Sequence, residues 1–399
     1  MAKMFVLSHS TARLIHRLPR EALNPVMLHK GIAAVRSSAP TKRDLAGIRA
    51  KLRERGMGEE AVQDLEFTVT EPRGCRNLNG TRIHVHTRPI PISDLVYLGD
   101  GLYVVDIRLC ALQAACQMEL EELVEYYYEI CSDYALPLVD DDSYQTRPPL
   151  TSVQLLREYL SRQKHEHGLR LARRAVRYTR DGARSPMETV LALLFVLPKS
   201  CGGLSIRDIE LNYYVRVTDA ARKVTRRAYF YFDIYIKRAR LDVEHNGRIH
   251  ESDDVEPIDE ERKNALDAMG YQLVTFRRQS LFDAEAFMRI MVSVRRRAGI
   301  GPAHLPAGFD ERQEQLRKFV LRRWLNSEDT SPNEDAGSTP DEPDPFIDEI
   351  PTEEMDINQE LPPEWEDFDD IPPEDRSDDD VPEQPDEQPR ENSLGYEWE

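Results

Sequence analysis

The sequence predicts an α/β protein with three parts: an α+β N-terminal domain, a mixed sheet flanked by helices, and a disordered acidic C-terminal tail. Residues 229–246 alternate apolar and polar side chains, as a two-stranded antiparallel hairpin does. A helical pattern at 258–269 and a short apolar run at 271–276 follow this hairpin. Residues 327–399 contain 12 prolines and 29 acidic side chains, too polar a composition to bury a core.

These patterns divide the chain into five expected segments: an N-terminal domain at 1–136, a linker at 137–151, a sheet-containing domain at 152–300, an amphipathic helix at 301–326, and the tail at 327–399. In the first segment, residues 5–17 predict a short helix capped by Ser8 or Ser10. Strands are expected within 65–107 and two helices at about 108–135. An isolated histidine near a helix start is usually structural, so we assign no function to His9 or His16.

A basic helix precedes the hairpin. Four arginines recur at i, i+3, i+4 and i+7 and therefore share one helical face: Arg170, Arg173, Arg174 and Arg177. Such a stripe either contacts the phosphates of a nucleic acid or is a solvated surface. The tail carries two basic side chains and a net charge of −27, whereas residues 1–326, with 43 acidic and 51 basic side chains, carry +8. A basic body favours a polyanionic partner.

The hairpin itself brings two carboxylates together. If its turn is centred between Arg238 and Ala239, Asp233 lies directly opposite Glu244. Asn246 follows on the same face. Two carboxylates this close require a shared proton, an arginine or a metal. The pattern is typical either of a site for a hard divalent cation or of a solvated polar sheet face.

The opposite face of the hairpin is expected to be apolar and buried, through Phe232, Ile234, Ile236, Leu241 and Val243. The helix that follows should end at Gly270, which suits a helix C-cap. A strand–helix–strand step of this length makes a right-handed crossover between parallel strands. The hairpin and the crossover together predict a mixed sheet.

Several motifs around the hairpin occur in an order that resembles a known family: Ser185-Pro186-Met187-Glu188, Asp233, Glu244-His245-Asn246-Gly247, His250, Asp259-Glu260-Glu261-Arg262 and Gly270-Tyr271. Residues 185–298 resemble the PD-(D/E)XK nuclease superfamily, in particular the Vsr-like endonuclease-domain group of bacterial proteins. The resemblance implies a restriction-endonuclease-like fold.

The resemblance also implies a metal-dependent endodeoxyribonuclease. Asp233 and Glu244 would hold Mg²⁺ or Mn²⁺, with Glu188 as a further ligand, and the metal would activate the attacking water. Asn246 departs from the pattern, because most members have lysine there and asparagine carries no charge. His250 or Lys263 is the candidate to replace that lysine.

The alternative function is a non-catalytic DNA-binding or antitoxin-type regulator that uses a degenerate nuclease fold. The N-terminal region resembles AbiEi-like antitoxins at Leu7-Ser8-His9, Ile83-His84-Val85-His86 and Gly101-Leu102-Tyr103-Val104-Val105, but no helix-turn-helix precedes Ser8. The arrangement of the carboxylates separates the two functions. Convergence on a metal favours the enzyme, and a salt bridge from Arg240 or Arg262 across the carboxylates favours the regulator.

The sequence also limits compartment and partners. We find neither a signal peptide nor an apolar run long enough to span a bilayer. The five cysteines form no CxxC pair, which argues against a cysteine zinc cluster and a disulfide framework. We therefore expect a cytoplasmic protein whose partner is DNA, with no membrane contact. The acidic tail either competes with DNA for the basic body or serves only to keep the chain in solution.

Overall fold

The computed structural model describes residues 3–23, 33–70, 78–138, 143–246 and 256–325, with the backbone alone at 22 and 256–259. The strands are β1 (Phe5–Leu7), β2 (Ala34–Val35), β3 (Leu65–Val69), β4 (Thr81–Val85), β5 (Ile90–Pro91), β6 (Leu95–Gly99), β7 (Leu102–Val105), β8 (Tyr134–Ala135), β9 (Gln145–Thr146), β10 (Ile209–Arg216), β11 (Tyr229–Ile236), β12 (Leu241–Asn246) and β13 (Gln272–Arg277). The α-helices are α1 (His9–Arg17), α2 (Arg20–Leu23), α3 (Lys42–Glu54), α4 (Ile107–Ala114), α5 (Leu120–Ile130), α6 (Val153–Arg162), α7 (Leu169–Val176), α8 (Pro186–Val196), α9 (Glu256–Ala268), α10 (Arg278–Phe282), α11 (Ala284–Arg297), α12 (Phe309–Val320) and α13 (Arg322–Leu325).

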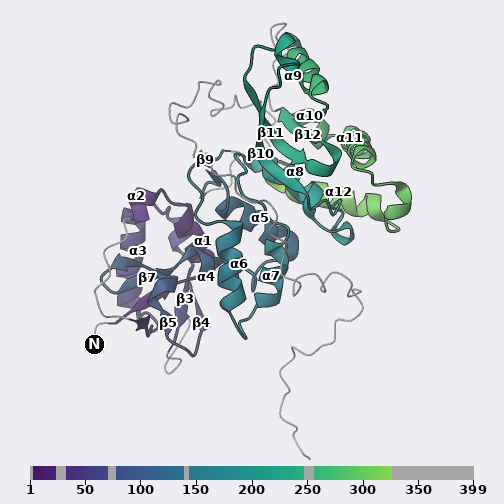
Figure 1. The fold of residues 1–399 in the computed structure, drawn as a ribbon. Helices are drawn as coiled ribbons and strands as arrows, with labels where there is room; N and C mark the ends of the chain where they lie inside the picture. Colours follow the sequence, from purple (N-terminus) through teal and green to yellow (C-terminus); the bar gives the residue numbers. More distant parts are fainter. Residues whose placement is uncertain (1–2, 24–32, 71–77, 139–142, 247–255, 326–399) are drawn as a thin grey trace, which may run out of the picture. The chain divides into compact units, whose positions relative to one another are not determined.

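A five-stranded mixed sheet organises the N-terminal half, in the order β4-β3-β1-β7-β6 (Figure 1). The central strand β1 is parallel to β7 and antiparallel to β3. The expected strands within 65–107 and the two helices after them are confirmed as β3, β4, β6, β7, α4 and α5. The expected helix at 5–17 is wrong in its first turn, because Phe5, Val6 and Leu7 are buried as the middle strand.

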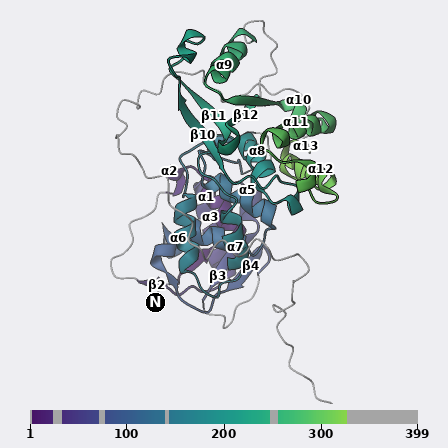
Figure 2. The same ribbon diagram turned by 45° about the vertical axis from the view of Figure 1, so that its right-hand side comes forward.

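Four helices, α4 to α7, pack together beside this sheet. Helix α7 lies against both α5 and α6 (Figure 2), and α4 contacts α6 and α7. Helices α6 and α7 lie in the segment that we assigned to the sheet-containing domain. In the structure their buried residues, such as Leu156, Ala172 and Val176, join the core that α4 and α5 form. Helix α5 also contacts α8, the first helix of the next sheet.

The second sheet has four strands in the order β10-β11-β12-β13. Strands β10, β11 and β12 are antiparallel neighbours, and β12 and β13 are parallel. Helix α8 precedes β10 and packs on β11 and α12, whereas α9 connects β12 to β13 (Figure 1). The expected hairpin, crossover and parallel pair are therefore confirmed, and the chain is a mixed α/β protein. Among the described residues, no helix is both long and apolar enough to cross a membrane.

The apolar face of the hairpin differs from the expectation at one residue. Ile234 and Ile236 join the large core cluster, but Phe232 packs with Tyr235 in a second cluster that also contains Leu266 of α9. The alternation of side chains between the two faces of β11 fails next to Asn212, a residue of the neighbouring strand β10 that has a left-handed φ of +49°. No pairing joins Asn212 to Asp233, although the residues on either side pair regularly, so the strands are irregular beside Asp233.

Candidate active site

Glu188 is fixed in the first turn of α8. Ser185 caps this helix, and Pro186 occupies its first turn, where a proline loses no helical hydrogen bond. The Ser185 hydroxyl donates to Oε1 of Glu188 at 3.1 Å. The backbone N–H of Arg184 and the side-chain amide of Asn212 donate to Oε2, at 2.9 and 2.6 Å. The buried carboxylate is therefore held in one orientation.

The hairpin has the register that its sequence predicts, and its described pairs end one residue before Asp233 and Glu244. Ile234 pairs with Val243 and Ile236 with Leu241, a register centred between residues 238 and 239. Continued by one residue, this register sets Asp233 opposite Glu244. Oδ2 of Asp233 accepts a hydrogen bond of 2.9 Å from the backbone N–H of His245, which ties the two strands together beside the carboxylates.

The acidic groups at this end of the sheet affect one another electrostatically. Burial raises the pKa of Glu188 to about 7, and the charge of Asp233 adds to the shift. Burial also raises the pKa of Asp233, although hydrogen bonding and nearby guanidinium groups oppose it. Burial and the neighbouring Glu244 raise the pKa of Asp242 well above its usual range. Burial thus disfavours the charges of Glu188, Asp233 and Asp242, and Glu244 adjoins Asp242.

Arg262 of α9 is the cation that faces them. Its Nη2 atom donates to Glu244, to Oδ2 of Asp242 at 3.3 Å and to the carbonyl oxygen of Tyr231 at 2.8 Å. The guanidinium also lies over the ring of Phe230, 5.0 Å from its centre. Arg184 is a second guanidinium close enough to act on Asp233, so two positive charges lie near the four carboxyl groups. Oδ1 of Asp242 is buried and accepts no hydrogen bond from the residues that the structure describes.

Sequence reasoning missed Asp242 and Arg184 as members of this site. Asp242 precedes Glu244 by two residues on β12, so the period of a strand placed it on the same face. Arg184 lies over the ring of Tyr231 at 4.7 Å, and its charge opposes the rise in the pKa of Asp233. The sequence feature that could have indicated Arg184 was its position directly before Ser185, which caps α8. Asn246 ends β12 opposite Arg277, and His250 lies outside the described residues.

Three tyrosines form an exposed cluster on β10 and β11. The rings of Tyr214, Tyr229 and Tyr231 have centroids 5.4 to 5.7 Å apart, in tilted and edge-to-face pairs. Tyr214 is 49 % exposed and Tyr229 is 38 % exposed. Because Arg184 stacks on Tyr231 and Arg262 binds its carbonyl oxygen, the cluster adjoins the carboxylates.

The arginine stripe on α7 is not uniform. Arg173 donates from Nη2 to the carbonyl oxygens of Leu160 at 2.9 Å and Gln163 at 3.1 Å, and so binds the C-terminal end of α6. The expected phosphate contact is therefore corrected for Arg173, because these carbonyls occupy its guanidinium. Arg170 and Arg174 are exposed, and Arg177 is half-buried.

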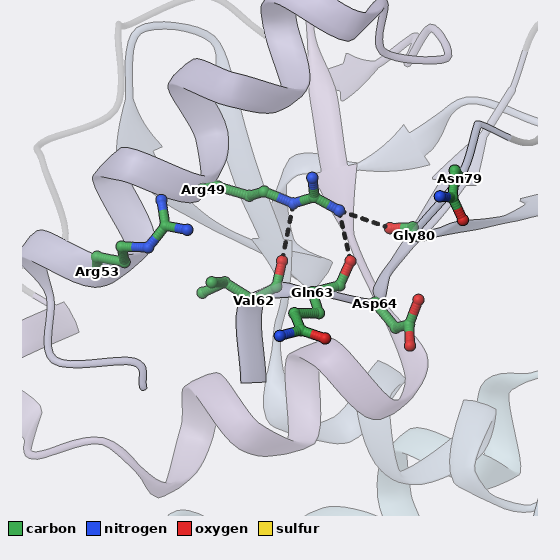
Figure 3. Close-up of a pocket in the computed structure, with 7 residues that line it drawn as sticks. All are labelled: Arg49, Arg53, Val62, Gln63, Asp64, Asn79 and Gly80. Atoms are coloured by element: carbon green, nitrogen blue, oxygen red, sulfur yellow. Dashed lines mark hydrogen bonds between the residues drawn. The ribbon is translucent and has the colours of Figure 1, made fainter. Parts of the chain in front are cut away.

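A pocket in the N-terminal half is lined by Arg49, Arg53, Val62, Gln63, Asp64, Asn79 and Gly80 (Figure 3). Its central side chain is Arg49, whose Nε donates to the carbonyl oxygen of Val62 at 2.9 Å and whose Nη2 donates to those of Gln63 and Gly80. These bonds join α3 to the entry of β3. Arg49 therefore stabilises the fold here, and we assign no ligand to the pocket.

Comparison with known proteins adds no identification: no family model, no curated protein and no solved structure matches this chain.

Proposed function

We propose that α8, β10, β11, β12, α9 and β13 form a PD-(D/E)XK-like domain that binds DNA and hydrolyses its phosphodiester bonds with a divalent cation. The observation that carries the proposal is a row of interacting acidic groups at one end of the second sheet: Glu188 of α8 beside Asp233 of β11, and Asp242 beside Glu244 on β12. The ligand oxygens of Glu188, Asp233 and Glu244 are not all within 4.8 Å of one another, so a bound ion would draw them closer together. The order of these elements and the motifs quoted from the sequence support the same fold.

The charges of the site fit a cation. The Arg262 guanidinium forms ion pairs with Asp242 and Glu244, and Oδ1 of Asp242 is buried without a hydrogen-bond partner among the described residues. Hard divalent cations such as Mg²⁺ prefer carboxylate oxygens. Asp233 and Glu244 would hold the ion, with Glu188 as a further ligand. A bound cation would supply charge for the phosphate and lower the pKa of a water molecule.

The residues around the ligands have roles of their own. Ser185 and Asn212 orient Glu188 through hydrogen bonds to its two oxygens. Exposed Arg184 is placed to attract a phosphate beside the carboxylates. The tyrosine cluster of Tyr214, Tyr229 and Tyr231 offers flat rings on which unpaired bases would stack. Arg170 and Arg174 are the remaining candidates for phosphate contacts on α7.

A second candidate function, a non-catalytic DNA-binding or antitoxin-type regulator, is favoured by the contacts of Arg262. Its guanidinium already bridges Asp242 and Glu244, as an arginine does where it replaces a metal. Asn246 also lacks the positive charge that lysine brings to active members. The two candidates differ in one measurable property, which is cleavage.

The test is a nicking assay on supercoiled DNA with Mg²⁺ or Mn²⁺, run beside a DNA-binding assay. Asp233→Asn and Glu244→Gln each remove one ligand charge and little volume. We expect each to reduce cleavage by about 100-fold or more while DNA affinity changes little. Asp267→Asn, which removes an exposed carboxylate of α9, is the matched control and should cleave as the parent does.

The possible outcomes separate the candidates. A parent protein that binds DNA but cuts it with neither metal supports the regulator. Full activity of Asp233→Asn or Glu244→Gln shows that the proposed site is wrong. A parent that neither binds nor cuts DNA overturns both functions.

A further inference from the structure

A second polar cluster lies in the N-terminal sheet, remote in sequence from the hairpin. His9 stands at the start of α1, Glu66 on β3 and His84 on the neighbouring strand β4. Strands β3 and β4 are parallel, with Thr68 opposite His84. Glu66 precedes Thr68 by two residues, so Glu66 and His84 lie close together on adjacent strands. His9 and Glu66 are buried, and His84 is half-buried. The cluster is therefore internal on one side and reachable from solvent on the other.

The three side chains are close enough to share one ion. Each offers a ligand atom, an imidazole nitrogen or a carboxylate oxygen, and these atoms all lie within 4.8 Å of one another. Among the described residues no other group of three histidine, cysteine or acidic side chains meets this criterion, Glu188, Asp233 and Glu244 included. Adjacent ligands of a tetrahedral zinc ion, about 2.0–2.2 Å from the metal, are separated by roughly 3.3–3.6 Å. Binding one ion would bring the three atoms to that spacing and turn at least one of the two rings so that both nitrogens face the ion.

The two rings are stacked, and one of them contacts the carboxylate. His9 and His84 stack with their centroids 3.5 Å apart and their planes 14° from parallel. Nε2 of His84 lies 2.5 Å from Oε2 of Glu66. Each of the two imidazoles can offer a ring nitrogen as a ligand atom. Neutral imidazole is the form that binds metals.

Surrounding side chains fix these three groups, as outer partners do around bound metals. The Ser8 hydroxyl lies 2.9 Å from Nδ1 of His9, which leaves Nε2 of that ring available. Ser10 donates to Oε1 of Glu66 at 2.5 Å, and Gln117 donates to Oε2 at 3.0 Å.

The backbone is strained at the same place. His9 has a φ of +52°, a left-handed conformation that is uncommon for a residue other than glycine. Hydrogen bonds hold it there, because the N–H of His9 donates to Gln113 at 3.1 Å and the N–H of Ser8 donates to the carbonyl oxygen of Glu66 at 3.0 Å. Strain of this kind persists where surrounding contacts over-determine a functional geometry.

We propose that His9, Glu66 and His84 form a binding site for a divalent transition metal of the zinc class, independent of the carboxylate site in the second sheet. Two imidazoles and one carboxylate are a ligand set that suits zinc and leaves a fourth position open. The half-exposed His84 sets that position toward solvent. Mg²⁺, which prefers oxygen ligands alone, is not expected to bind here.

The test is titration of the full chain with Zn²⁺ by calorimetry in a buffer that does not chelate metal. We expect one high-affinity site in the parent, and an affinity at least about 100-fold lower in His84→Ala and in Glu66→Gln. His86→Ala removes another histidine that follows on the same chain segment and should bind zinc as the parent does. Glu244→Gln should also retain the site, which separates it from the hairpin carboxylates.

Two further measurements keep the result decisive if a variant folds poorly. Circular dichroism reports folding, and Glu66→Gln preserves the volume of the side chain. Co²⁺ in place of Zn²⁺ should give the parent a visible absorption band that His84→Ala lacks. Equal zinc affinity in the parent and His84→Ala, equal loss in His86→Ala, or no zinc binding by the parent would each overturn the proposal.

Discussion

Arg262 is the residue on which the charge of the second sheet depends most directly. It contacts Asp242, which is fully buried, and Glu244, whose side chain is 19 % exposed. Replacing Arg262 by glutamine leaves both carboxylates without their cation, so we expect the free energy of unfolding to fall by about 3 kcal/mol. Because a bound cation would supply the missing charge, Mg²⁺ should stabilise this variant more than it stabilises the parent. Urea unfolding with and without Mg²⁺ measures both effects.

The matched control is Arg289→Gln, which breaks an exposed pair with Glu285 one turn away on α11. Exposed pairs contribute less than about 1 kcal/mol, so its stability should stay close to that of the parent in either buffer. If Mg²⁺ stabilises Arg262→Gln no more than the parent, the carboxylates of the hairpin do not hold the ion.

The arginines of helix α7 have different roles: Arg173 is structural, whereas Arg170 and Arg174 are exposed. Arg173 binds carbonyl oxygens at the end of α6, and Arg173→Ala should lower the free energy of unfolding by about 1–2 kcal/mol. Arg170→Ala and Arg174→Ala should leave stability unchanged. If these two side chains contact phosphates, the double variant should bind DNA more weakly and reduce the salt dependence by a slope of about one per lost contact. Thermal unfolding and DNA titrations at several salt concentrations measure the two effects, and an unchanged slope would show a solvated surface.

The elements that could be predicted are those whose determinants lie close together in sequence. The hairpin register follows from alternation around residues 238 and 239, and the crossover follows from the helical pattern and Gly270. The strand β1 was missed because three buried residues are too few to show a period. The left-handed Asn212 of β10, which accompanies the changed position of Phe232, has no signature in a strand pattern.

The candidate sites show the same division between near and distant contacts. Asp233 and Glu244 were predictable because one turn joins them. By contrast, His9 and His84 are 75 residues apart, and only the pairing of β1, β3 and β4 brings them together. His9 was an isolated histidine near a helix start, for which a structural role is the usual expectation, and His84 was noted only within the Ile83-His84-Val85-His86 strand. His16 does have such a role, since its Nε2 lies 2.8 Å from the carbonyl oxygen of Val105 in a buried contact.

At the scale of the whole molecule, charge is divided unequally along the chain. Residues 1–326 carry +8 and residues 327–399 carry −27, so that the whole chain carries −19. The acidic segment lies outside the described residues. Because this segment is covalently joined to the body, its charge would repel a polyanion that comes within about one Debye length of it. The sign of the net charge therefore opposes DNA binding in the full chain and favours it in residues 1–326.

Deleting the residues after Asn326 should consequently tighten DNA binding by about tenfold or more at low salt. The difference from the full chain should shrink as salt increases, since the Debye length falls from roughly 30 Å at 0.01 M to about 8 Å at 0.15 M. A full-length variant in which the tail's acids are changed to asparagine and glutamine keeps the length and removes the charge. It should bind like the deletion if charge is the cause, and like the parent if chain length is. Equal affinities of the full chain and the deletion at low salt would show that the tail does not affect DNA binding.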